Sequence, residues 1–343
     1  MNKKFKTIFI SLAAIALVMV LNYKKYSIKN AAAQNAEVNI SEKMVPVFNE
    51  KGIDNIAYIG MVKDEDDIIF ENLVWHYSIG FRKFIILNNN SSDQTLDLIS
   101  KFKEKVKDTA TVIIINDPIF EYIQSRKMTG TYKFASSIWS EVEWIFPIDA
   151  DEFIVPTKDL REALNKVAAN IDAIQILCAR HHVVKGSKID STPFYDNIKF
   201  RENAFKVRLG KVAVRAHKDI VIEQGNHFAT KNWSNVLGKK TKIFKSLSYT
   251  AGNTLGIHMT EYPIRSLSQV HKKFLNGAKA NIAVQKQGKI ALAHGSQWSS
   301  YEKEMEEKGL KAAEDRFEKS FIDKDNAVYD PLPIADVLSK FGQ

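Results

Sequence analysis

The chain has 343 residues, of which 45% are hydrophobic and 26% charged, and its single cysteine is Cys178. This composition excludes a disordered chain, a collagen and a polytopic membrane protein, and the length is ample for a buried core. One cysteine excludes an intramolecular disulfide framework and a zinc site built on cysteine pairs. The formal net charge is +9, but six lysines and no acid lie in residues 1–30. The remainder holds 43 basic and 40 acidic side chains, so we expect no nucleic-acid partner.

The N-terminal segment places an apolar run, residues 8–21, between two lysine clusters. A transmembrane helix needs about 20 residues, and flanking residues with snorkelling lysines extend this run toward that length. We therefore expect residues 1–30 to form an apolar helix that anchors the chain to a membrane. Its orientation is open, because three lysines stand on each side. A cleaved signal peptide ending near Ala31–Ala33, or a soluble helix, are the alternatives.

From residue 53 onward the sequence alternates between apolar runs and amphipathic stretches, after a small, polar linker over residues 31–50. The expected strands are 56–62, 84–87, 111–115 and 144–148, and the expected helices are 65–79, 93–106 and 127–140. We expect Asp64 to cap the first helix and Ser92 or Asp93 to cap the second. Continuous apolar runs that alternate with helices predict an α/β fold, in which helices cover both faces of a mostly parallel, twisted sheet.

Two polar segments follow expected strands, at residues 88–93 and 149–152. Ligands of α/β sheets bind at the carboxyl ends of the strands. Asp149, Asp151 and Glu152 repel one another there, and a hard divalent cation removes that cost because carboxylate oxygens suit Mg²⁺ or Mn²⁺. Asp149 and Asp151 could place one carboxylate on the metal and the other on a ribose or a bridging water. A solvated turn is the simpler interpretation of an Asp-x-Asp sequence.

Three sequence blocks stand in order within residues 56–156, and a fourth follows later. The blocks are Lys63–Ile68 with Glu71–Gly80, then Leu87–Thr95, then Pro147–Phe153, and finally Tyr262–Ser266 with Gln269 and Lys273. Together they resemble the nucleotide-sugar-binding part of a glycosyltransferase family 2-like protein of the GT-A fold. The resemblance implies a metal-dependent transferase, which moves a sugar from a nucleotide-sugar donor to an acceptor hydroxyl.

The resemblance also implies roles for individual residues. Asp149 and Asp151 match the Asp-x-Asp motif that holds Mn²⁺ or Mg²⁺ against the donor diphosphate. Lys63 and the loop with Asn88 and Asn89 match positions near the base and ribose. The two asparagines stand where aspartates are usual in the family, which leaves the nucleotide preference open. Asparagine can bond a base edge, but it is also an ordinary turn former.

An inverting transferase needs a carboxylate or histidine that takes the proton of the acceptor hydroxyl. The candidate bases are Glu202, Glu223, His227, His258 and Glu261. Of these, Glu223, His227 and Glu261 are preferred, and Glu261 stands where relatives often carry histidine. His258 is also a candidate metal or diphosphate ligand. Arg265 begins an expected helix over 266–276 and is the candidate diphosphate contact.

We therefore predict a membrane-associated, metal-dependent, inverting glycosyltransferase with a nucleotide-sugar donor and a glycan or glycolipid acceptor. Residues 51–270 would form the GT-A-like domain, and 271–343 a mainly helical C-terminal extension with a charged helix at 300–318. The alternative is a catalytically silent sugar-binding or scaffold protein that retains the GT-A fold. The asparagines at 88 and 89 and the unassigned base motivate that alternative.

Overall fold

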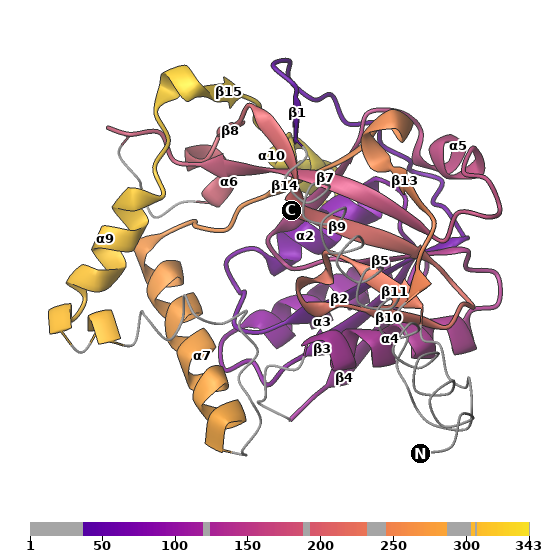
Figure 1. Cartoon of the computed structure of the whole chain (residues 1–343), viewed down its shortest axis with the longest axis horizontal. Helices are drawn as coiled ribbons and strands as arrows, with labels where there is room; N and C mark the ends of the chain where they lie inside the picture. Colours follow the sequence, from indigo (N-terminus) through magenta and orange to yellow (C-terminus); the bar gives the residue numbers. More distant parts are fainter. Residues whose placement is uncertain are drawn as a thin grey trace, which may run out of the picture.

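The computed structural model describes residues 37–118, 124–187, 193–231, 245–286, 303–305 and 307–342. They form a mixed α/β structure around one large sheet (Figure 1). The expected N-terminal apolar helix lies outside the described residues, and none of the described helices is long and apolar enough to cross a membrane. Membrane anchoring therefore stays a prediction.

The first four expected strands are present, parallel and adjacent, in the order β5-β2-β3-β4. They are β2 (Ile56–Val62), β3 (Lys83–Asn88), β4 (Thr111–Asn116) and β5 (Trp144–Pro147). Their ends agree with the sequence prediction to within one residue. Because the strands are parallel, their carboxyl ends lie along one edge, where Asn88 pairs with both Val62 and Asn116.

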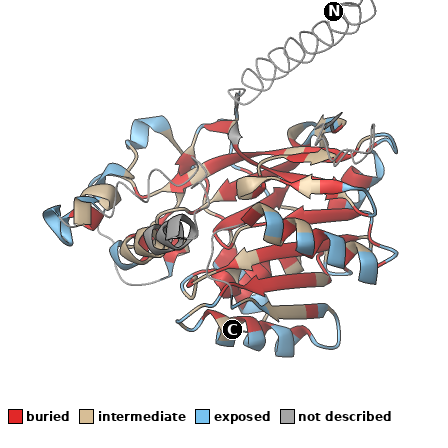
Figure 2. Cartoon of the chain, turned by 60° about the horizontal axis from the view of Figure 1, so that its bottom comes forward, coloured by how far each residue is buried: buried red, intermediate tan, exposed pale blue. Residues whose placement is uncertain are grey.

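Helices cover both faces of these strands, as predicted. The helices α2 (Ile69–Ser78) and α3 (Thr95–Val106) belong to the larger hydrophobic core, and α4 (Gln124–Ile138) belongs to a second core. Along β2, Tyr58 points into the first core, whereas Ala57 and Ile59 point into the second. Figure 2 shows the resulting layer of buried residues along the sheet. The apolar runs are continuous because both faces of the strands are covered.

The two helix starts differ from the prediction. Helix α2 begins at Ile69 rather than at residue 65, and the backbone of Asp64 is left-handed, with φ 53°. The Asp64 carboxylate instead accepts the N–H of Ser92 at 2.6 Å, so the predicted cap is wrong. Helix α3 begins at Thr95, whose N–H donates to Asp93 Oδ1 at 3.0 Å. Asp64 thus joins the loops that follow β2 and β3.

The prediction of a mostly parallel sheet is correct only for the first half of the domain. The later long strands are β6 (Glu152–Pro156), β7 (Ala173–His182), β9 (Ala204–Arg215) and β14 (Ile257–Glu261). Strand β9 is antiparallel to β5 and β7, and β14 is antiparallel to β6 although parallel to β7. The connections between β6 and β9 carry helices of only six and four residues, so the described part of this half of the sheet lacks the long helices that follow β2, β3 and β4.

Several short elements complete the domain. The short strands are β1 (Glu37–Asn39), β8 (Phe200–Glu202), β10 (Ile220–Ile222), β11 (Ala229–Lys231), β12 (Lys245–Ser246), β13 (Tyr249–Ala251) and β15 (Ala327–Tyr329). The short helices are α5 (Leu160–Asn165) and α6 (Phe194–Asn197), with 3₁₀ turns η1 (Gln224–Asn226), η2 (Gly252–Leu255) and η4 (Lys324–Asn326). Residues 37–50, expected as part of a linker, lie against the domain, because β1 pairs with β9 and Val47 N donates to Pro156 O at 2.7 Å.

The C-terminal part contains α7 (Leu267–Lys286), α9 (Lys311–Lys319) and α10 (Ile334–Lys340). Figure 1 shows α7 and α9 side by side at the margin of the sheet, and they share a small apolar cluster around Val270 and Ala312. Helix α9 carries ion pairs on its surface, including Lys311 with Glu314. Helix α10 packs on α2 and contributes to the main core.

Candidate active site

Asp149 lies two residues after the end of β5, and three side chains from three other elements contact its carboxylate. Gln124 Nε2 at the start of α4 and Asn226 Nδ2 in η1 both donate to Oδ1 at 3.1 Å. Lys211 Nζ from β9 lies 2.6 Å from Oδ2. These contacts engage both oxygens and hold the carboxylate in one orientation.

Lys211 is a buried lysine that two carboxylates share. Its Nζ also lies 2.8 Å from Glu152 Oε1 and 2.5 Å from the carbonyl oxygen of Gly225, and its side chain is 4% exposed. Burial opposes its charge, but Asp149 and Glu152 raise the pKa of Lys211 above its ordinary value. Burial also raises the pKa of Glu152 in spite of Lys211, and the neighbouring aspartates raise it further. Lys211 is therefore a charged part of the framework.

Asp151, Glu152 and Glu261 form a compact group of carboxylates. One oxygen from each lies within 4.8 Å of the oxygens of the other two. Glu152 begins β6 and Glu261 ends β14, and the two residues are partners in the antiparallel pairing. Tyr262 N donates to Asp151 O at 2.8 Å, and Arg180 Nε lies 2.8 Å from Glu261 Oε2. The group is therefore built by adjacent strands rather than by the Asp-x-Asp sequence alone.

Asp151 receives its counter-charge from α7. Lys273 Nζ lies 2.7 Å from Asp151 Oδ2, and the Lys273 side chain is 32% exposed. Burial would raise the pKa of Asp151, but the charges of Lys273 and Arg265 outweigh it and lower the pKa to about 2. In turn, Asp151 and Glu65 raise the pKa of Lys273 against the effect of burial. Both groups of this pair are thus ionised at neutral pH.

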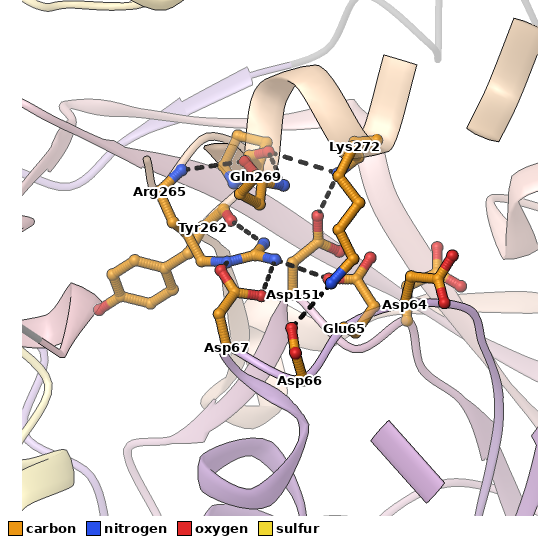
Figure 3. Close-up of polar contacts among 12 residues, drawn as sticks. Asp64, Glu65, Asp66, Asp67, Asp151, Tyr262, Arg265, Gln269 and Lys272 are labelled. Carbon is orange, nitrogen blue, oxygen red and sulfur yellow. Dashed lines mark hydrogen bonds and ion pairs between the residues drawn. The ribbon is translucent and has the colours of Figure 1, made fainter. Parts of the chain in front are cut away.

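Arg265 was expected to contact a diphosphate. In the structure it forms ion pairs with acidic residues of the first sequence block (Figure 3). Its Nε and Nη2 form a bidentate pair with Asp67 at 2.7 and 2.8 Å, and Nη2 also lies 2.6 Å from Glu65 Oε2. Its Nη1 donates to Tyr262 O at 2.9 Å, and the residue is 3% exposed. The position of Arg265 therefore indicates that it holds the start of α7 to the loop after β2.

Two residues of α7 itself reach the same loops. Lys272 Nζ lies 2.8 Å from Asp66 Oδ1 and also contacts Asp93, and Figure 3 shows Lys272 extending toward Asp66. Asn276 Nδ2 donates to Asp64 Oδ2 at 2.6 Å. Arg265, Lys272 and Asn276 therefore fasten the first turns of α7 across the strand ends without using Asp151.

The residues expected near the donor base lie at the ends of β2 and β3. Lys63 Nζ donates to a backbone carbonyl of the loop after β3 at 2.7 Å. Asn88 Nδ2 donates to Asn116 Oδ1 at 3.1 Å, and Asn89 Oδ1 accepts from Lys127 Nζ at 2.8 Å. Both asparagines are buried. These contacts join the end of β3 to β4 and α4.

The three preferred candidate bases have different surroundings. Glu261 belongs to the carboxylate group. His227 Nδ1 lies 2.7 Å from a carbonyl oxygen of β9, and burial together with the Lys211 charge lowers the pKa of His227 to about 4. A neutral ring that donates from Nδ1 keeps a lone pair on Nε2. The Glu223 carboxylate accepts from Thr230 Oγ1 at 2.8 Å.

His258 and Glu202 are not brought to the carboxylate group. His258 lies three residues before Glu261 on β14, so its side chain points to the opposite face, where it contacts the Phe205 ring. Burial lowers the pKa of His258 to about 4. Glu202 lies on β8 and pairs with Lys206 at 2.9 Å. The position of His258 therefore does not suit a ligand of the same metal as Asp151.

No protein-family model and no curated protein matches the sequence. Among solved structures, residues 1-349 of S. aureus TarS in complex with UDP are 18% identical, with a TM-score of 0.30 over 41% of this chain and 39% of that chain. The Pyrobaculum calidifontis mannosyltransferase PcManGT in complex with GDP-Man and Mn²⁺ is 14% identical, with a TM-score of 0.30 over 59% and 56%. The S. cerevisiae mannosyltransferase Ktr4p is 15% identical, with a TM-score of 0.25 over 41% and 44%.

This chain covers less than two thirds of the length of each of these proteins. Likeness of this extent assigns no activity to it. The functional argument therefore depends on the residues of the site.

Sequence reasoning selected Asp149 but missed the side chains that hold it. Gln124, Lys211 and Asn226 lie 25, 62 and 77 residues away along the chain. Lys211 could have been noticed in the sequence because it is a charged residue beside the apolar run of β9. Gln124 and Asn226 are ordinary polar residues in the sequence, and only the packing of α4 against β5 and of η1 against α4 and β9 brings them to Asp149.

The group of Asp151, Glu152 and Glu261 fits a divalent cation by its chemistry. All three offer carboxylate oxygens, which are the ligands that Mg²⁺ and Mn²⁺ prefer. The raised pKa of Glu152, to which both neighbouring aspartates contribute after burial, reflects a repulsion that a cation would relieve. The group includes Asp151 of the expected metal pair, whereas Asp149 is engaged by Lys211, Gln124 and Asn226.

Proposed function

We propose that the chain is a metal-dependent glycosyltransferase that moves a sugar from a nucleotide-sugar donor to a hydroxyl of a glycan or glycolipid, with inversion. The observation that carries this proposal is the convergence of Asp151, Glu152 and Glu261 beyond β5, at the edge where α/β sheets bind ligands. The sequence blocks that resemble family 2 glycosyltransferases also meet there, since Asp64 bonds Ser92 across two of them.

The residues divide into two sets in this proposal. Asp151, Glu152 and Glu261 would hold Mn²⁺ or Mg²⁺, which supplies positive charge against the leaving nucleoside diphosphate. Asp149, fixed by its three partners, would orient the donor ribose. Lys63 at the end of β2 would lie near the nucleotide base.

The proton acceptor is proposed from two of the preferred candidates, Glu261 and His227. A carboxylate that holds the metal is a poor proton acceptor, so Glu261 is the base only if it does not ligate the ion. His227 is neutral at pH 7 and has a fixed ring orientation. The kcat values of Glu261→Gln and His227→Gln, measured at saturating donor, separate them. The base is the residue whose replacement lowers kcat while donor binding is kept.

A donor panel tests the proposed activity. Purified protein is incubated with nucleotide sugars and Mn²⁺, and release of the nucleoside diphosphate is measured. We expect turnover of one donor class, loss of turnover with a chelator, and at least a roughly hundredfold loss in Asp151→Asn. The exposed Asp97 of α3 provides the control variant Asp97→Asn, which should keep full turnover. Turnover that withstands both the chelator and Asp151→Asn would contradict the metal assignment.

One observation favours a second candidate function. Lys211 and Lys273 already neutralise carboxylates of the cluster, and such internal pairing suits a silent sugar-binding or scaffold protein. Titration calorimetry with nucleotide sugars and Mn²⁺ separates the two candidates. Donor binding that requires Mn²⁺ supports the transferase, and absence of binding across the panel supports the scaffold.

We also propose that residues 1–30 attach the enzyme to a membrane, on the basis of the apolar run and its flanking lysines. Fractionation of cells that express the full chain tests this proposal. A chain that starts at residue 31 should move to the soluble fraction. A mature N-terminus near residue 33, found by mass spectrometry, would identify a cleaved signal peptide instead.

A further inference from the structure

The two lysines at the carboxylate cluster are held very differently. Lys211 contacts three oxygens, from Asp149, Glu152 and Gly225, and its side chain is 4% exposed. Lys273 contacts Asp151 at 2.7 Å, its bond to the Pro263 carbonyl is longer at 3.4 Å, and its side chain is 32% exposed. Lys273 can therefore leave its carboxylate far more readily than Lys211 can.

Lys273 also contacts a carboxylate that a divalent cation would need. Asp151 belongs to the group that fits such an ion, and an ammonium on Oδ2 competes with it by like-charge repulsion. The long, flexible lysine side chain can move away without a change in the backbone.

The backbone of Lys273 stays in place when its ammonium moves, because other residues fasten α7. Arg265 pairs with Asp67, Lys272 pairs with Asp66, and Asn276 bonds Asp64. The other acids that influence Lys273 already have partners, since Glu65 pairs with Arg265 and Glu261 pairs with Arg180. A displaced Lys273 ammonium would therefore find its new partner on an incoming anion.

We propose that Lys273 is an exchangeable cation, which neutralises Asp151 until a divalent ion binds and then contacts the donor diphosphate. This inference rests on the proposed function. It gives the diphosphate contact to Lys273 rather than to Arg265, whose guanidinium is occupied by Asp67 and Glu65. Lys273 would thus make diphosphate binding depend on metal binding. The metal would bind before the diphosphate or together with it.

The experiment compares two affinities in one variant, Lys273→Met. Mn²⁺ alone is titrated into the full chain by calorimetry and by electron paramagnetic resonance. UDP and GDP are then titrated at saturating Mn²⁺. We expect Lys273→Met to bind Mn²⁺ several-fold more tightly, because the competing charge is gone. We expect the variant to bind the nucleoside diphosphate roughly tenfold more weakly, because a charge-assisted hydrogen bond is lost.

Matched variants separate this exchange from a general change in charge. Lys272→Met removes the neighbouring ammonium, which contacts Asp66 and Asp93 rather than Asp151, and should change neither affinity by more than about twofold. Lys273→Arg retains the charge and should keep much of the diphosphate affinity. Circular dichroism and thermal unfolding confirm that each variant is folded.

The outcomes distinguish this inference from the proposed function. Opposite shifts of the two affinities in Lys273→Met support the exchange. If the unmodified chain turns over a donor but Lys273→Met binds Mn²⁺ no more tightly, the inference is overturned and the proposed function stands. If the unmodified chain binds neither Mn²⁺ nor any nucleoside diphosphate, both are overturned.

Discussion

Asp149 and Asp151 are two residues apart, yet the fold surrounds them in different ways. Elements of the central domain hold Asp149, since its partners come from α4, β9 and η1. The side-chain partner of Asp151 is Lys273 of α7, a helix that lies across the strand ends. One side of the cluster is therefore a fixed framework, and the other depends on how α7 is docked.

This difference has a physical basis in burial and in the number of partners. The Lys211 side chain is 4% exposed and its ammonium requires its carboxylates, whereas the Lys273 side chain is 32% exposed. Removing one partner of a fully buried pair leaves an unpaired charge in a medium of low polarity. When Lys273 is removed, water compensates part of the loss, because its side chain is 32% exposed although Asp151 is buried. The comparison thus predicts unequal effects of similar substitutions.

The largest effect is expected from Lys211→Met. The variant leaves the carboxylates of Asp149 and Glu152 without their buried cation, so the free energy of unfolding should fall by about 3–5 kcal/mol. Urea denaturation followed by circular dichroism measures the loss. Lys273→Met, the matched comparison, also strands the buried Asp151 carboxylate, but the replaced side chain is 32% exposed, so the loss should be smaller, about 1–2 kcal/mol.

A second substitution sharpens this test. In Lys211→Met/Glu152→Gln, one of the stranded carboxylates becomes neutral, and part of the lost stability should return. Equal losses in Lys211→Met and Lys273→Met would remove the distinction between the framework side and the α7 side.

Arg265→Met tests how α7 is docked. The guanidinium is buried against Asp67 and Glu65, so we expect a loss of about 2–4 kcal/mol in unfolding free energy. Because the two acids belong to the loop after β2, the variant also releases the start of α7 from that loop. Limited proteolysis should therefore cleave α7 at a higher rate than in the unmodified chain. Lys272→Met removes a more exposed pair and is the control. Proteolysis at the same rate in both variants would show that Arg265 does not fasten the helix.

The sequence predicted what local patterns determine. The apolar runs predicted β2 to β5 because each strand is buried on both faces, and the residues after β5 identified the carboxylate edge. The expected Asp64 cap was wrong because its partner, Ser92, lies in another loop. Likewise, Arg265 and Asp67 both fall within the blocks noticed in the sequence, but they are 198 residues apart, and no local pattern predicts their pairing.

Acidification should weaken the framework side through His227. Its pKa is about 4 in the folded protein and 6.5 in an ordinary setting, so between these pH values the unfolded chain binds a proton that the folded chain does not. The unfolding free energy therefore falls as pH decreases from 6.5 to 4. His227→Gln removes this contribution. Between pH 7 and 4 the variant should lose about 1–3 kcal/mol less unfolding free energy than the unmodified chain loses. Urea denaturation at both pH values measures this difference, and identical losses would contradict it.

The smallest effect is expected from Gln124→Leu, which removes one of the three partners of Asp149. The variant loses the hydrogen bond to Asp149 and the one that Gly225 N donates to Gln124 Oε1 at 3.0 Å, while Asn226 and Lys211 remain, so the unfolding free energy should fall by about 1–2 kcal/mol. Asn226→Leu should cause a larger loss, because Asn226 has φ 57°, where leucine is strained, and the double variant should lose more than the sum, because Lys211 alone then orients the carboxylate. Thermal unfolding of the four proteins measures this coupling. Strict additivity would show that each partner acts independently, and that the fixed orientation of Asp149 is not a property of the network.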